Sequence, residues 1–112
     1  MVSPSEEASC PICALHGDRD ELKAHEVWRS DFWLLRHHPS PAPLPGWCLL
    51  DSLRHSGGPI SFLPEEAQDW GVVVQRASQL VLAVTGCERV YVIAFGEGAR
   101  HLHLHLIPRW AD

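Results

Sequence analysis

The chain has 112 residues, 46% of them hydrophobic, and a net charge of −5 with histidine counted as neutral. This length predicts one domain that buries about two-thirds of its unfolded surface. The negative charge and the lack of a basic stripe exclude nucleic-acid polymers as expected partners and leave single nucleotides open. Residues 1–8 are polar and contain a proline, so they are predicted to be a disordered end ahead of a domain over residues 9–112.

The first residues do not have the basic and then apolar character of a signal peptide, and no apolar run is long enough to span a bilayer. The sequence therefore predicts a cytoplasmic protein without a membrane partner. In a reducing compartment, the four cysteines favour metal binding or free thiols over disulfides.

Cys10 and Cys13 form a C-x-x-C pair near the start of the chain. Such a pair either holds a metal or acts as a redox dithiol. The redox alternative needs a helix that follows a strand, and nothing before Cys10 resembles a strand. A metal site needs further ligands, and His16 and His25 are nearby candidates. Both lie in a charged run that is predicted to be an exposed loop or a short helix.

Two segments rich in aromatic and aliphatic residues precede the middle of the chain. Residues 27–36 predict a β-hairpin. Residues 37–45 contain four prolines, which exclude regular structure and predict a rigid extended connection. Gly46 ends this connection, residues 47–53 predict a third strand, and His55 follows immediately in a loop.

One long helix is predicted to begin at Pro64 and to stop at Gly86. Proline in the first turn followed by Glu65 and Glu66 is typical of a helix start, and glycine is a common residue after a helix end. The apolar side of this helix is wider than one sheet needs. Residues 90–95 are then a continuous apolar run, which predicts a central strand covered on both faces.

Three histidines alternate with leucines from His101 to His105. Alternation is the period of a β-strand, so the imidazoles are expected on one face and the leucines on the other, in the core. Histidines two positions apart on a strand lie about 6.5 Å from each other, which lets neighbouring rings share an anion or lets one hold a metal while the next does chemistry. A lone histidine on a strand is usually a solvated surface residue, but three in strict alternation favour a function.

The run His101-Leu102-His103-Leu104-His105-Leu106-Ile107 resembles the signature of the histidine triad (HIT) family, His-φ-His-φ-His-φ-φ with φ apolar. The resemblance implies the HIT-like fold, an α+β fold whose antiparallel sheet of about five strands carries one long helix. It also implies a nucleotidyl hydrolase or transferase that acts on a phosphoanhydride or phosphoramidate of a nucleoside monophosphate. In that reaction the middle histidine, His103, attacks the α-phosphorus to form a nucleotidyl-histidine, and His105 contacts the phosphoryl oxygens.

Some branches of the family also carry an N-terminal C-x-x-C and a histidine after the third strand, and use the first triad histidine for zinc. The resemblance therefore implies a structural zinc site made by Cys10, Cys13, His55 and His101. Two thiolates and two imidazoles are a suitable ligand set for such a site. The alternatives are a zinc-free C-x-x-C on the surface and a His55 that binds phosphate. The resemblance implies a homodimer as well, paired through the helix and a central strand.

The loop before the triad departs from the family pattern. Gly96 and Gly98 are candidate phosphate contacts through their backbone N–H groups, and a plain turn is the alternative. The loop lacks the asparagine and the glutamine or serine that members carry there, and residues 36–38 stand where members carry an acid for the ribose. A second function therefore stays open, a zinc-stapled domain that binds a nucleotide or a protein partner without turnover.

Overall fold

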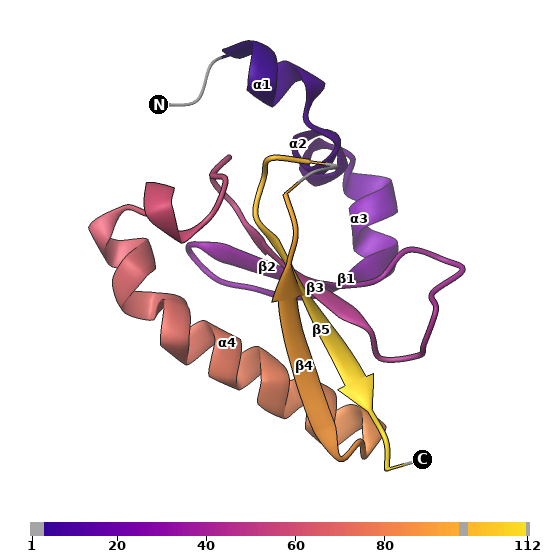
Figure 1. Cartoon of the computed structure of the whole chain (residues 1–112). Coiled ribbons are helices and arrows are strands. Elements are labelled where there is room, and N and C mark those ends of the chain that lie inside the picture. The colour runs from indigo at the N-terminus through magenta and orange to yellow at the C-terminus, as the bar shows by residue number, and fades with distance from the viewer. Residues whose placement is uncertain (1–3, 97–98, 112) are drawn as a thin grey trace.

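The computed structural model describes residues 4–96 and 99–111 (Figure 1). It is an α+β fold with a five-stranded sheet in the order β1-β2-β3-β5-β4, and all neighbouring strands are antiparallel. The strands are β1 (Glu26–Arg29), β2 (Trp33–His37), β3 (Cys48–Ser52), β4 (Arg89–Ala94) and β5 (His103–Arg109). The predicted fold class, the hairpin and the third strand are confirmed.

Three short helices precede the sheet: α1 (Pro4–Ser9), α2 (Pro11–Gly17) and α3 (Arg19–His25). Figure 1 shows them grouped at the end of the sheet where the chain enters β5. Cys10 caps α2, because its sulfur accepts a hydrogen bond from the backbone N–H of Cys13. Of the predicted disordered end over residues 1–8, Met1 to Ser3 lie outside the described residues, whereas the residues from Pro4 onward form α1. The division into this end and a domain over residues 9–112 stays a prediction.

The long helix α4 (Pro64–Thr85) follows the short turn η1 (Pro59–Ser61) and crosses one face of the sheet (Figure 1). It begins at the predicted proline, and Gly86 ends it in the left-handed conformation with φ 68°. Its buried side chains meet those of the sheet in one core, made by Trp33, Leu35, Cys48, Leu50, Val73, Ala77, Val81, Leu102, Leu104 and Leu106. Within the described ranges, no helix has both the length and the apolar character needed to cross a bilayer.

The prediction of a central strand over residues 90–95 is wrong. β4 lies at the edge of the sheet, and β5 occupies the position between β3 and β4. Several apolar side chains of this segment are exposed, among them Val92 at 45%. An apolar run measures how much apolar surface a strand carries, but it does not say whether the same chain covers that surface.

Candidate functional site

β5 carries two of the three triad histidines on the face that points away from α4. The strand begins at His103, and Leu104 and Leu106 lie in the core under the helix. The alternation of a strand therefore places His103 and His105 on the opposite face. His101 precedes the strand and is only 1% exposed. The expected single row of three imidazoles is therefore divided, because the bend before β5 turns the first ring towards the N-terminal helices.

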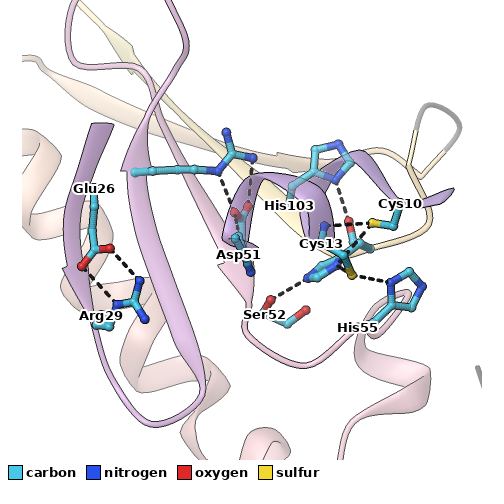
Figure 2. A network of polar contacts seen from close by, with 11 residues as sticks. Cys10, Cys13, Glu26, Arg29, Asp51, Ser52, His55 and His103 are labelled. Atoms are coloured by element: carbon cyan, nitrogen blue, oxygen red, sulfur yellow. Dashed lines mark hydrogen bonds and ion pairs between the residues drawn. The ribbon is translucent and has the colours of Figure 1, made fainter. Parts of the chain in front are cut away.

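His101 meets three residues from distant parts of the chain, and the four predicted metal ligands come together. Cys10, Cys13, His55 and His101 each offer one ligand atom, and these atoms lie within 4.8 Å of one another. The Cys13 sulfur is 3.2 Å from His55 Nδ1 and 3.4 Å from His101 Nδ1 (Figure 2). The Cys10 sulfur is 3.5 Å from His101 Nδ1. The four cysteines of the chain are all free thiols.

The three sulfur–nitrogen separations of 3.2–3.5 Å are close to those of a tetrahedral zinc site. Bonds of about 2.0–2.3 Å to nitrogen and sulfur place neighbouring ligand atoms about 3.3–3.8 Å apart. His101 Nε2 donates a hydrogen bond to the carbonyl oxygen of Ser52 over 2.6 Å, so the lone pair lies on Nδ1, the atom that faces the thiols. Such an outer partner is typical of a metal-ligating histidine.

The pKa values of two ligands describe the protonation of the cluster without a metal. Burial and the neighbouring Cys10 raise the pKa of the Cys13 thiol to about 11, so two thiolates do not stand together there without a compensating positive charge. Burial lowers the pKa of His101, which keeps its imidazole in the neutral form that a metal ligand needs. The donor set therefore fits a structural zinc ion.

The other two histidines that the sequence offered as ligands have different partners. His16 Nε2 is 2.9 Å from a carboxylate oxygen of Asp51, although its ring packs edge-on against His101. His25 lies 3.4 Å from Glu21 within α3. Both are therefore outside the cluster.

His103 has a hydrogen bond that fixes its tautomer. Its Nδ1 lies 2.7 Å from the carbonyl oxygen of His101 (Figure 2). A carbonyl only accepts hydrogen bonds, so Nδ1 carries the proton and the lone pair of the neutral ring is on Nε2. An imidazole held in this way has its lone pair on Nε2, the arrangement that a nucleophilic histidine needs.

A buried ion network lies beside His103 and was missed by the sequence reasoning. Asp51 pairs with His103 across the β3–β5 ladder and is 0% exposed. Its carboxylate accepts hydrogen bonds from Arg36 Nε at 2.6 Å and from His16. Burial alone would raise the pKa of Asp51, but the hydrogen bonds from His16 and Arg36 outweigh it and lower the pKa. One signal was available, since an acid inside the apolar run of residues 47–53 needs a buried partner.

His105 is the second histidine of the exposed row. It is half-buried, and burial, followed by the charges of His103, His38 and Arg36, lowers its pKa. Trp47, just before β3, donates a hydrogen bond from its indole nitrogen to His105 Nδ1 over 3.0 Å. Sequence reasoning assigned Trp47 to a strand and gave it no role in the site.

The two glycines proposed as phosphate contacts are not tested by the structure. Gly98 lies outside the described residues. Gly96 is exposed, with open space around the position of a Cβ. Their contact with a phosphate stays a prediction.

The fold is that of solved HIT proteins. A HIT-like protein from Bartonella henselae, described as involved in cell-cycle regulation, superposes with a TM-score of 0.76 at 22% identity and covers 93% of this chain and 82% of its own. A HIT family member from Bacillus subtilis gives 0.77 at 17% identity and covers 93% and 75%. A zinc-bound histidine triad family protein from Mycobacterium smegmatis gives 0.74 at 20% identity and covers 95% and 78%. No protein-family model matches the sequence, and no curated protein matches it either.

Proposed function

We propose that this chain is a HIT-type nucleotidyl hydrolase or transferase that cleaves a phosphoanhydride or phosphoramidate bond of a nucleoside monophosphate. The observation that carries the proposal is the hydrogen bond from His103 Nδ1 to the carbonyl of His101, which leaves a lone pair on Nε2. His105 stands beside it, with 5.7 Å between the ring centroids, within reach of the same phosphoryl group. The fold shared with HIT proteins supports the same reaction class.

The reaction proceeds in two displacements. His103 Nε2 attacks the α-phosphorus, a P–N bond forms, and the bond from phosphorus to the leaving group breaks. The leaving group takes the electron pair and a proton from solvent. In the second step a water, or another acceptor with an O–H, attacks phosphorus, the P–N bond breaks and its electrons return to Nε2. The proton of the water is released to solvent, and the nucleoside monophosphate departs.

The zinc site is a structural part of this proposal. Cys10 and Cys13 would hold the ion from α2, His55 from the loop after β3, and His101 from the approach to β5. The ion would supply four bonds that link these segments, and it would play no part in the displacement. Because the carbonyl of His101 holds His103, fixing the His101 ring also fixes the support of the nucleophile.

The test is release of AMP from an aminoacyl-type phosphoramidate of AMP. We expect the zinc-loaded chain to release AMP and His103→Ala to lose about a thousandfold or more in rate while still binding AMP, since a nucleophile has no substitute. His25→Ala, which changes an imidazole in α3 outside the site, is the matched control. An acid quench during turnover must destroy an adduct on His103 that a basic quench preserves. Turnover that survives in His103→Ala contradicts the proposal.

The second candidate is a zinc-stapled domain that binds a nucleotide or a protein partner and turns nothing over. Arg36 favours it, because this residue stands where family members carry an acid for the ribose. Its guanidinium is already hydrogen-bonded to the Asp51 carboxylate. The same assay separates the two functions. AMP binding without AMP release from any phosphoramidate or dinucleotide identifies the binding domain.

We also propose that the chain is a homodimer. The edge strand β4 exposes Tyr91, Val92 and Ile93, and the adjoining helix α4 exposes Leu80 and Val84. An exposed edge with apolar side chains on a sheet is a surface that pairs with another chain. A second copy covers it symmetrically and completes a sheet across the two chains.

A further inference from the structure

Trp47 and His105 meet through a hydrogen bond between two ring nitrogens. Trp47 Nε1 is 3.0 Å from His105 Nδ1, and the ring centroids are 5.7 Å apart in an edge-on arrangement. An indole nitrogen only donates. His105 Nδ1 is therefore the acceptor, and the proton of its neutral ring is on Nε2.

His103 and His105 thus hold opposite protonation patterns. The Nε2 of His103 carries a lone pair because its Nδ1–H donates to a carbonyl, whereas the Nε2 of His105 carries the proton. The two rings are neighbours on one face of β5. One offers an electron pair and the other an N–H donor, which suits a phosphoryl group that is attacked at phosphorus and held by an oxygen.

The backbone around Trp47 is held from several sides. The backbone N–H of His38 donates to the Trp47 carbonyl over 2.8 Å, and the His38 ring packs edge-on against the indole. The N–H of Gly46 donates to His37 Nε2 over 2.9 Å. Gly46 has φ 88°, and a Cβ there would overlap the Thr85 side chain. These contacts hold the end of the proline-rich connection (residues 37–45) in one conformation, and so fix the position of the Trp47 indole.

We propose that Trp47 is a positioning residue, which fixes His105 as the tautomer with its proton on Nε2 and so keeps a donor aimed at the phosphoryl group that His103 attacks. This inference rests on the proposed function for the identity of the ligand. The contact with Trp47 itself does not depend on turnover. Burial of His105, which lowers its pKa, acts in the same direction because it keeps the ring neutral.

The contact can be tested directly by NMR on the zinc-loaded, 15N-labelled chain. We expect scalar coupling between Trp47 Nε1 and His105 Nδ1 across the hydrogen bond, and a proton on His105 Nε2 alone. In Trp47→Phe the tautomer or the ring orientation of His105 becomes mixed, and kcat/KM falls about fivefold, the loss expected for one hydrogen bond. Trp28→Phe is the control, because Trp28 lies in β1 and packs against Arg76.

Each outcome decides one of the two ideas. Absence of the coupling, or a proton on His105 Nδ1, overturns the role of Trp47. The same conclusion follows if Trp47→Phe turns substrate over as fast as Trp28→Phe. If the wild-type chain turns over no nucleotide at all, the proposed function fails, and AMP binding replaces turnover as the readout. Trp47→Phe must then weaken AMP binding about fivefold against the control, and equal binding overturns the positioning role.

Discussion

Two ion pairs of the same chemical kind differ in burial and allow a matched prediction (Figure 2). The side chains of Arg36 and Asp51 are 6% and 0% exposed, whereas those of Arg29 and Glu26 are 49% and 29% exposed. Asp51→Asn leaves the Arg36 guanidinium buried without a counter-charge, so we expect it to lower the free energy of unfolding by about 3–5 kcal/mol. Glu26→Gln should cost no more than about 1 kcal/mol, because water screens the exposed pair.

The measurement is urea unfolding followed by tryptophan fluorescence, with equal zinc in every sample. A loss of about 3–5 kcal/mol is a large share of the roughly 5–15 kcal/mol that stabilises a typical domain. The burial argument is wrong if Asp51→Asn costs no more than Glu26→Gln. Equal losses would mean that water or a neighbouring group compensates the charge of Arg36.

The same carboxylate makes a prediction about pH. The pKa of Asp51 is lower in the folded chain than its ordinary value, although burial alone would raise it, because His16 and Arg36 hydrogen-bond the charged form. The stability it contributes is therefore present above its unfolded pKa of about 3.9 and is lost as the pH falls towards the lower folded value. We expect the wild type to lose more stability than Asp51→Asn on acidification below about pH 5. Parallel losses refute the shift.

Two further predictions concern the metal and the second copy. Purified protein should contain one zinc per chain by elemental analysis, and Cys13→Ser should lose the metal and the stability that it provides. Cys87→Ser, which changes a buried cysteine outside the cluster, should keep the zinc. A metal-free wild type refutes the site. By light scattering the chain should show twice its mass of 12.5 kDa. Val92→Lys on β4 should give the monomer, while Ile60→Lys in η1, an apolar side chain that is 99% exposed, stays dimeric. A monomeric wild type contradicts the pairing.

Local patterns predicted the five strands and the long helix of this fold, because each depends on residues near one another in sequence, whereas the short helices α1 and α2 were not predicted. Pro64 and Gly86 marked the ends of α4, and the alternation after His101 marked the triad strand. The order of strands was not accessible in this way. The place of β4 at the edge depends on pairing between β3 and β5, which are about fifty residues apart in sequence.

The candidate site was predicted in part for a related reason. Paired cysteines and alternating histidines have few structural uses, so their presence in the sequence indicates a functional site. The resemblance to HIT proteins supplied His55. Trp47 and Arg36 have many structural uses, so their types carry little information. Their roles follow from partners on other strands, the His105 ring and the Asp51 carboxylate, which only the folded chain brings near.

The three triad histidines show how one residue type acquires three chemistries within five positions. Each ring is oriented by a different acceptor or donor: the Ser52 carbonyl for His101, the His101 carbonyl for His103 and the Trp47 indole for His105. The first two acceptors leave a lone pair on Nδ1 and on Nε2 respectively, and the donor leaves an N–H on Nε2. The partner of each ring therefore decides whether it is suited to ligate a metal, attack phosphorus or hold an oxygen. A substitution that exchanges partners should change the chemistry without touching a histidine, which is why Trp47 is the most informative position outside the triad.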